Sequence, residues 1–319
     1  MNPLEKVRVG RTDVTVTRLG LGLAPLGSLF TSVSDETARA TLDRAWQLGI
    51  RYFDVAPLYG NGLAERRAGA VLAGKPRAEF TLSTKVGRLI RAGGSQQEFW
   101  ADDDGTLGPV FDFSAAGTLA SYAESLDRLG LDRADILHLH DPDNHYEQAV
   151  SGALPALAGL RAAGRIGAVS AGMNQPEMLA DLVRTGELDC VLLAGRFSLL
   201  DQSGGDELLP LCAERGVSVI VGGVFNSGLL ADPRPGARFD YVTADDATLD
   251  RALALRDACR RHDVPLRAAA IQFPFTHPAV TAVVVGARTP DEVADAVAMA
   301  AVPLPTGLWA DLRAEGLIV

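Results

Sequence analysis

Short apolar runs alternate with amphipathic segments along nearly the whole chain. The apolar runs are rich in Val, Ile, Leu and Ala, which is typical of strands that are buried on both faces of a sheet. Eight such runs predict strands at 17–24, 52–56, 80–86, 134–140, 166–172, 189–195, 217–223 and 282–287.

The segments between these runs carry apolar residues at helical spacing. They predict helices at 34–49, 64–74, 118–130, 147–164, 176–186, 206–216, 244–276 and 289–300. Strict alternation of strand and helix predicts a parallel sheet of the α/β class, and eight units favour a closed (β/α)8 TIM barrel over an open doubly wound sheet. No G-x-G-x-x-G motif joins a strand to a helix, which counts against a Rossmann domain.

Two segments depart from this rhythm. Residues 5–20 form two short alternating runs around a turn, which predict an N-terminal β-hairpin. Residues 87–116, after the third strand, mix Gly, Pro, acidic and aromatic residues without a clear period, which predicts a long loop insertion. We therefore expect one barrel domain over residues 1–319, with 87–116 as an inserted lid-like loop. Trp100 within it and Phe30 after the first strand are candidate substrate contacts.

Composition and charge narrow the range of partners. The chain is 47% hydrophobic and 22% charged, as expected of an ordinary globular enzyme, and its net charge of −10 argues against nucleic acid or an anionic membrane surface as a partner. Its three cysteines form no C-x-x-C pair, so a disulfide framework is not expected. The N-terminus lacks a signal-peptide core, and no run of 18 apolar residues is present. We expect a cytoplasmic protein acting on a small molecule, with its oligomeric state left open.

Four polar side chains fall where barrel strands end. Asp54 closes the second strand, Lys85 the third and His140 the fourth, while Tyr59 lies on the loop after the second strand. Because active sites of (β/α)8 barrels sit at the carboxyl ends of the strands, we expect these four residues to converge.

Such a set is suited to moving a proton on or off an alcohol oxygen. The pKa of a tyrosine hydroxyl is near 10, and a nearby ammonium group favours the phenolate and lowers that pKa. A carboxylate such as Asp54 would hold Lys85 in place, and a histidine would orient a substrate oxygen. No side chain accepts a hydride, so carbonyl/alcohol redox chemistry at this site requires a cofactor.

Other readings of the same residues remain open. Asp54 alone could be a helix cap or turn residue, and His140 alone a structural histidine. His138 and His140 lie on one face of a strand, an arrangement that metal-dependent barrel hydrolases use. The fifth to eighth predicted strands end without a His or a carboxylate, so a second metal-binding strand end is missing and we expect no metal. A non-catalytic nicotinamide-binding regulator is a further alternative.

The segments FDVAPLYG, STKVG and ILHLHDPD resemble those of the aldo-keto reductase superfamily, and the likeness extends over essentially the whole chain. The resemblance implies that Tyr59, Asp54, Lys85 and His140 match the family's catalytic tetrad. It also implies that the tyrosine is the general acid/base and that the cofactor is a nicotinamide dinucleotide.

Within the superfamily, GLAPLG, APLYGNGLAERR, VFDFS and HDPD most resemble the aldose 1-dehydrogenase group, which includes L-fucose dehydrogenase and D-threo-aldose 1-dehydrogenase, with pyridoxal 4-dehydrogenase nearby. This implies NAD(P)-dependent oxidation of an aldose at C1 to a lactone. The alternatives are pyridoxal 4-dehydrogenase activity and general aldehyde or ketone reduction.

The resemblance also suggests where a dinucleotide would bind. Its pyrophosphate is expected near the loops after strands seven and eight. Glu292 would repel the 2′-phosphate of NADP and could accept a hydrogen bond from the 2′-hydroxyl of NAD, so we favour NAD, although Arg288 could still bind the phosphate. The candidate cofactor contacts are Gly22, Leu23, Asp54, Asn174, Gly223, Phe225, Ser227, Gly286, Arg288 and Glu292.

Overall fold

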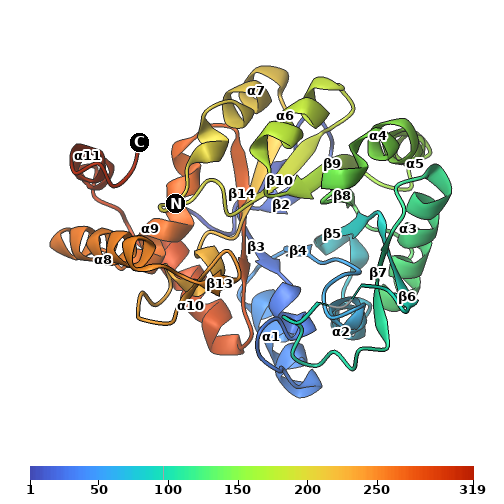
Figure 1. Ribbon diagram of the computed structural model, residues 1–319, viewed down its shortest axis with the longest axis horizontal. Coiled ribbons are helices and arrows are strands. Elements are labelled where there is room, and N and C mark those ends of the chain that lie inside the picture. Colours follow the sequence, from blue (N-terminus) through green and yellow to red (C-terminus); the bar gives the residue numbers. More distant parts are fainter. Residues whose placement is uncertain (96) are drawn as a thin grey trace.

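The computed structural model describes residues 1–95 and 97–319, and its centre is a closed parallel barrel (Figure 1). Around the barrel the strands follow the order β3-β4-β5-β8-β9-β10-β11-β14, which confirms the predicted (β/α)8 fold. The barrel strands are β3 (Leu19–Gly22), β4 (Tyr52–Asp54), β5 (Thr81–Val86), β8 (Ile136–His140), β9 (Ala168–Met173), β10 (Cys190–Ala194), β11 (Ser218–Gly222) and β14 (Val280–Gly286).

Helices surround the barrel on its outside (Figure 1). Ser34 caps the first of them by accepting a hydrogen bond from the Thr37 N–H, as the sequence predicts for a helix start. The helices are α1 (Asp35–Gln47), α2 (Leu63–Leu72), α3 (Ala115–Leu129), α4 (Tyr146–Gln148), α5 (Leu154–Ala162), α6 (Pro176–Arg184), α7 (Leu208–Arg215), α8 (Asp246–Arg261), α9 (Leu266–Gln272), α10 (Pro290–Ala301) and α11 (Leu308–Ala314).

Apolar side chains form two separate clusters. The larger one fills the space between strands and helices, as expected for strands that are covered on both faces. The smaller one lies inside the barrel and includes Val9 and Val16 of the N-terminal hairpin, whose strands are β1 (Lys6–Arg8) and β2 (Thr15–Thr17). Gly10 N–H donates to the Oγ of Ser218, the first residue of β11, at 2.7 Å. The predicted hairpin is thus confirmed, and it closes the end of the barrel at which the strands begin.

The insertion after β5 is more ordered than its composition predicts. β6 (Arg88–Ala92) and β7 (Leu107–Phe111) pair antiparallel within it, so the prediction of a structureless loop over 87–116 is wrong for these residues. Beyond the hairpin, Leu29 and Trp100 form an antiparallel bridge, and Phe30 N–H donates to the Phe99 carbonyl at 2.8 Å. The insertion is therefore anchored to the loop that follows β3.

Three other details differ from the prediction. The helical region 244–276 divides into α8 and α9 because Pro265 cannot continue a helix interior. The segment 147–164 contains a π-helical turn at Ala149–Ala153. A short hairpin of β12 (Arg238–Phe239) and β13 (Val242–Thr243) and the terminal helix α11 escaped prediction, because each is too short for a clear period.

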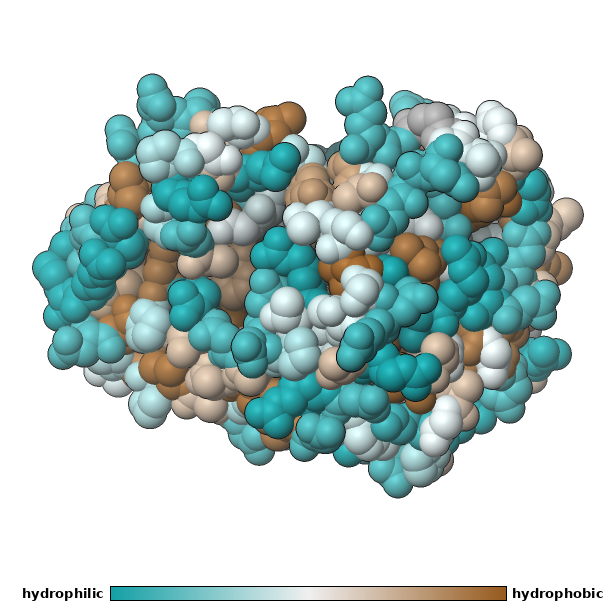
Figure 2. Space-filling model, turned by 90° about the horizontal axis from the view of Figure 1, so that it is seen from below, coloured by the Kyte–Doolittle hydropathy of each residue, from teal (hydrophilic) through white to brown (hydrophobic). Residues whose placement is uncertain are grey.

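A mostly hydrophilic molecular surface is expected for a sequence with 22% charged residues. Figure 2 shows a face that is mostly hydrophilic, with hydrophobic residues scattered among hydrophilic ones. Within residues 1–95 and 97–319, no helix is both long and apolar enough to span a bilayer.

Candidate active site

The strand register brings the predicted polar residues together. Asp54 pairs with Ser83 across β4 and β5, and Lys85 pairs with His138 across β5 and β8. Residues two apart on a strand share a face, so Ser83 and Lys85 point the same way, as do His138 and His140. The parallel barrel therefore collects these side chains at the carboxyl ends of three neighbouring strands.

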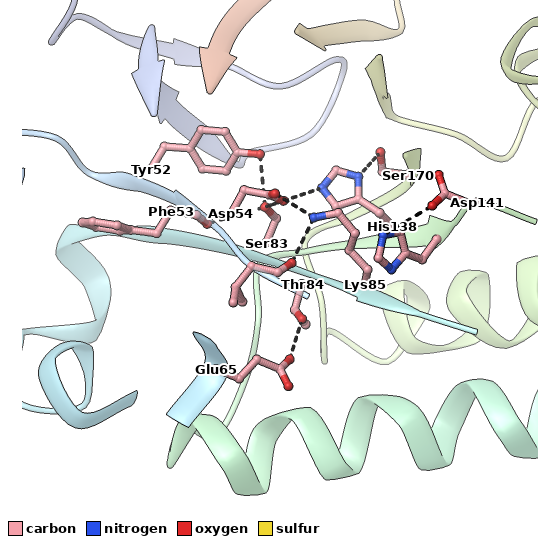
Figure 3. Close-up of polar contacts among 12 residues, drawn as sticks. Tyr52, Phe53, Asp54, Glu65, Ser83, Thr84, Lys85, His138, Asp141 and Ser170 are labelled. Atoms are coloured by element: carbon pink, nitrogen blue, oxygen red, sulfur yellow. Dashed lines mark hydrogen bonds and ion pairs between the residues drawn. The ribbon is translucent and has the colours of Figure 1, made fainter. Parts of the chain in front are cut away.

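A closed set of hydrogen bonds fixes Lys85. Its Nζ lies 2.6 Å from Asp54 Oδ2 and 3.0 Å from the Val55 carbonyl oxygen, and the lysine and aspartate side chains are 2% and 4% exposed (Figure 3). Ser83 Oγ donates to the other carboxylate oxygen of Asp54 at 2.7 Å and lies 3.1 Å from the Tyr52 hydroxyl. Both charges of the buried ion pair are thus compensated, as such pairs require.

His138 completes this buried set. Its Nδ1 lies 2.7 Å from Ser170 Oγ, and its Nε2 lies 3.6 Å from Asp54 Oδ1. Burial lowers the pKa of His138 to about 3, so the ring is neutral at pH 7. We call the set the inner cluster: Tyr52, Asp54, Ser83, Lys85, His138 and Ser170.

Tyr59 stands directly beside the inner cluster. Its ring centroid lies 4.9 Å from Lys85 Nζ, 6.1 Å from the ring of His140 and 6.0 Å from that of Trp100. The loop that carries Tyr59 passes so close to Gly27 that a Cβ there would lie 2.6 Å from the Tyr59 carbonyl carbon. A glycine at this position therefore allows the loop after β3 to hold the tyrosine.

The electrostatics of Tyr59 differ from the sequence-based expectation. Burial raises its pKa well above the ordinary value, with further increases from Asp54, Tyr241 and Asp141, whereas Arg88 opposes the shift. The expected net lowering of the pKa is not found, because burial of the Tyr59 hydroxyl is the largest effect and raises it. The phenol is therefore protonated at neutral pH.

His140 is also neutral at pH 7. Burial lowers its pKa well below the ordinary value, and the positive charges of Arg88 and Lys85 lower it further. A neutral imidazole can hydrogen-bond to a substrate oxygen without adding a charge to the site.

These residues line a cavity of about 340 Å³, a size suited to a small ligand. Tyr59, Lys85 and His140 form one part of its wall, and residues of the insertion and of the loops after β8 and β9 form much of the rest. The remaining lining residues are Ala24, Leu29, Leu58, Arg88, Gln97, Phe99, Trp100, Asp141, Asp143, Gly172, Met173, Asn174, Gln175, Leu192, Ala194 and Tyr241.

The other predicted contacts divide into two groups. Trp100 and Asn174 line the cavity, whereas Phe30 packs against Tyr241, with ring centroids 5.8 Å apart, and Phe225 packs against the main core. Leu23 is fully buried, and its N–H donates to the Asp54 carbonyl.

The predicted phosphate region lies where β14 meets β3. Gly286 pairs with Gly22 at the ends of these strands. Arg288 donates from its backbone N–H and from Nη2 to the two carboxylate oxygens of Glu292, at 2.7 and 2.8 Å. The predicted arginine and glutamate are therefore paired with each other at the start of α10.

The loop after β11 has features that fit a phosphate-bearing cofactor. Gly223, Asn226 and Ser227 have positive φ angles, and the N–H groups of Val224 and Phe225 donate no hydrogen bond within the described part of the chain. Clustered free amide groups of this kind can bind anionic oxygens. The residues present in this loop thus fit the phosphate groups of a nicotinamide dinucleotide.

Sequence reasoning missed several residues of the cavity wall. Arg88 and Asp141 form an ion pair at 2.5 Å, and Tyr241 reaches the cavity from the β12–β13 hairpin. The sequence does place Asp141 beside His140 at the end of the fourth predicted strand, but it predicts no role for this residue. Arg88 and Tyr241 depend on hairpins that the sequence pattern did not predict.

The described residues do not support the metal-site alternative. Among residues 1–95 and 97–319, no group of three or more His, Cys, Asp or Glu side chains could hold a metal ion. His138 is instead held by Ser170, as described above.

Comparison with known proteins identifies the family. The model of the Aldo/keto reductase family matches residues 18–314. The chain belongs to this family. Aldo/keto reductases are oxidoreductases and generally use nicotinamide cofactors.

Two enzymes of known activity are similar over almost their whole length. D-threo-aldose 1-dehydrogenase of Pseudomonas sp. is 44% identical over 314 residues, which cover 96% of this chain and 95% of that enzyme. Pyridoxal 4-dehydrogenase of Microbacterium luteolum is 42% identical over 336 residues, with 98% of each chain covered.

A solved structure is similar as well. An aldo-keto reductase of Bacillus halodurans in its holo form superposes with a TM-score of 0.78 at 28% identity, covering 99% of this chain and 96% of that one. The barrel described above is therefore that of the aldo/keto reductases.

Proposed function

We propose that this aldo/keto reductase oxidises an aldose at C1 to the lactone, with NAD as the preferred cofactor. The observation that carries the proposal is the convergence of Tyr59, His140 and the Lys85–Asp54 pair on one cavity. The 44% identity with a D-threo-aldose 1-dehydrogenase supports the substrate class. The three free, buried cysteines fit a reducing compartment, and we propose the cytoplasm.

In this proposal the residues divide the proton chemistry among them. Tyr59 first loses its own proton to solvent; the phenolate then takes the proton of the C1 hydroxyl as general base, and in the reverse direction the phenol donates its proton as general acid. Lys85 lies 4.9 Å from the centre of the Tyr59 ring and would stabilise the phenolate form that accepts the proton, while Asp54 holds Lys85 there. The neutral ring of His140 orients the reacting oxygen. A bound nicotinamide dinucleotide would accept the hydride.

The insertion 87–116 would shield this step from water. Trp100 covers one side of Tyr59, and Phe99 links Trp100 to Tyr241 through ring contacts of 5.1 and 5.7 Å. We propose that the insertion 87–116 acts as the lid of the site, since closure that excludes water strengthens the electrostatic interactions inside.

A second candidate activity is the oxidation of pyridoxal, because pyridoxal 4-dehydrogenase is 42% identical. A reduction screen separates the two, in which NAD⁺ and NADP⁺ are each offered with L-fucose, D-arabinose, L-galactose and pyridoxal. Turnover of an aldose supports the proposal, turnover of pyridoxal alone favours the alternative, and no turnover with any of them contradicts both.

The preference for NAD rests on the Arg288–Glu292 pair. Glu292 Oε1 accepts a hydrogen bond from the Arg288 guanidinium and Oε2 accepts one from the Arg288 backbone N–H, so the positive charge of Arg288 is paired with a carboxylate where a 2′-phosphate would bind. Glu292→Gln should release Arg288 and raise the ratio of kcat/KM for NADP⁺ over NAD⁺ by about tenfold, which is the effect of one added charge contact. An unchanged ratio would place coenzyme selection elsewhere in the protein. Arg267 of α9 forms a similar partly exposed pair with Asp295, which lies on α10 as Glu292 does, and Asp295→Asn is the matched control.

A further inference from the structure

A second polar group lines the cavity and takes no part in the proton chemistry above. It consists of Arg88, Asp141 and Asp143. Arg88 starts β6, three residues after Lys85, and Asp141 directly follows His140. The same two strand ends that carry proposed catalytic residues thus also carry this group into the cavity wall.

Arg88 is firmly held although its side chain is charged and buried. Its Nη2 lies 2.5 Å from Asp141 Oδ2, its Nε donates to the His140 carbonyl at 3.4 Å, and its guanidinium carbon lies 5.0 Å from the centre of the Phe111 ring. Only 9% of the Arg88 side chain is exposed. A guanidinium group fixed in this way presents its remaining donors in a set direction.

Asp141 adopts an unfavourable backbone conformation to reach this pair. Its φ angle is +44°, in the left-handed region, while its N–H donates to the Gly172 carbonyl at 3.1 Å. Strain of this kind persists only where the surroundings enforce it, and it is common at functional sites. The aspartate side chain is 27% exposed, and the residue lines the cavity.

The group keeps hydrogen-bonding capacity that the protein itself does not use. Within residues 1–95 and 97–319, Arg88 Nη1 donates no hydrogen bond, and the buried Asp143 Oδ1 accepts none. Polar atoms of cavity-lining residues that have no partner within the protein are available to a ligand with matching groups. Two carboxylates and one guanidinium together require both donors and acceptors from that ligand.

Charge narrows the class of ligand. The group carries a net charge of −1 if both carboxylates are ionised, which disfavours phosphates and carboxylates. An apolar aldehyde would bury these groups without partners, which is costly. A hydroxyl group both donates and accepts, and adjacent hydroxyls could contact the aspartates and Arg88 at once.

We propose that Arg88, Asp141 and Asp143 form a hydroxyl-recognition site that selects uncharged, polyhydroxylated substrates by the hydroxyl groups remote from the reacting carbon. This inference rests on the proposed function and deepens it, because it favours sugars over pyridoxal and over simple aldehydes at the same catalytic centre.

The test pairs substrates with protein variants. kcat/KM is measured with saturating dinucleotide for the best aldose and for its singly deoxygenated analogues, in the wild type, Asp141→Asn and Asp143→Asn. Removing the recognised hydroxyl should cost the wild type about 10- to 100-fold, mostly in KM, because hydrogen bonds to charged groups are involved. In the variant that lacks its partner, the same deoxygenation should cost less than about threefold.

A matched control separates recognition from a merely structural role. Arg91 lies on the same strand β6 and pairs with Glu124 in an exposed ion pair. Arg91→Met should leave the preference for hydroxylated over deoxygenated substrates unchanged. If the two aspartate variants keep the wild-type preference as Arg91→Met does, the ion pair only anchors the hairpin and the inference is overturned.

Failure of the inference can be told apart from failure of the proposed function. Turnover of simple aldehydes or pyridoxal with no gain from sugar hydroxyls would overturn the inference while redox activity remains. If no substrate is turned over, calorimetric titration of the dinucleotide-loaded protein with L-fucose and L-galactose still decides. Binding that weakens at least tenfold in Asp141→Asn or Asp143→Asn supports the site, and an absence of sugar binding overturns it.

Discussion

The inner cluster and the part of the cavity wall that contains Arg88 and Asp141 use similar residue types in different ways. We call this part of the wall, together with the insertion residues beside it, the wall. In the inner cluster, Lys85 meets Asp54 on two neighbouring barrel strands, and the hydrogen bonds of both charges are satisfied inside the protein. In the wall, Arg88 meets Asp141 on residues that follow the strands, and both border open space. In our proposal the first arrangement fixes a proton-transfer geometry, whereas the second leaves hydrogen-bonding capacity for a ligand.

The difference follows from the elements that carry the two groups. Each barrel strand is paired with a neighbour on both sides, so the positions of its side chains are well defined. The wall is carried by a hairpin and by loops, which tolerate changes of sequence without loss of the barrel. Apart from Tyr59, which lies on the loop after β4, the proposed chemistry is carried by strands and the proposed selectivity by a hairpin and loops, so substitutions should separate the two.

The sharpest test of the comparison is Tyr59→Phe. Removing the one hydroxyl that can exchange a proton should lower kcat by at least about 10³-fold, near the upper range for general acid/base catalysis. Dinucleotide binding should change less than about threefold, because the phenyl ring still packs against Trp100 and His140. Steady-state kinetics and fluorescence titration with NADH measure the two effects. Turnover near the wild-type rate would refute the role given to Tyr59.

Part of this comparison was accessible from the sequence. Asp54, Lys85 and His140 each close an apolar run, and the rule that parallel strands end at one rim is enough to bring them together. Tyr59 is only five residues beyond Asp54, so its place was also fixed. The eight-stranded fold was also accessible, because apolar runs alternate with segments of helical spacing and each of these local patterns agrees with the global arrangement.

The wall was not accessible in the same way. Arg88 enters it through a pairing with Phe111, a contact across the insertion that no local period announces. The raised pKa of Tyr59 was unforeseen as well, because it depends on how completely the assembled loops bury the ring. Both features arise from tertiary packing, which a one-dimensional pattern does not encode.

The inner cluster should also be visible in the pH dependence of stability. His138 has a folded-state pKa of about 3, below its ordinary value of 6.5, so it is neutral when folded and binds a proton on unfolding below pH 6.5. The unfolded state then binds more protons, and stability falls as pH drops from 6.5 towards 3. The contribution should reach about 1.4 kcal/mol per pH unit.

His138→Gln removes this titration. Urea unfolding at pH values from 7 to 5 should give free energies that fall more steeply for the wild type than for the variant, so the difference between them shrinks with acid. Parallel curves would mean that His138 is protonated in the folded protein, contrary to its burial.

Ser83→Ala tests whether the inner cluster must be fully bonded. The change leaves Asp54 Oδ1 and the Tyr52 hydroxyl without their partner and should lower the free energy of unfolding by about 2 kcal/mol. Because Asp54 Oδ2 still holds Lys85, kcat should fall less than tenfold.

The control is Thr84→Val, next along the strand, which loses its hydrogen bond to Glu65 on the opposite side of β5. It should destabilise the protein without changing kcat, and equal losses of kcat in both variants would argue that stability alone controls activity.

The smallest expected effect concerns the wall. Trp100 Nε1 donates to Gln97 Oε1 at 3.0 Å, and both residues line the cavity. Gln97→Ala and Trp100→Phe each remove this neutral hydrogen bond and should raise KM for the aldose about threefold with kcat unchanged, because such a bond contributes about 1 kcal/mol. The double variant should be no worse than either single one, since all three lack the same interaction. If the increases in KM multiply in the double variant, the two side chains contact the ligand separately. If kcat falls, the wall takes part in the chemistry, and the division between inner cluster and wall does not hold.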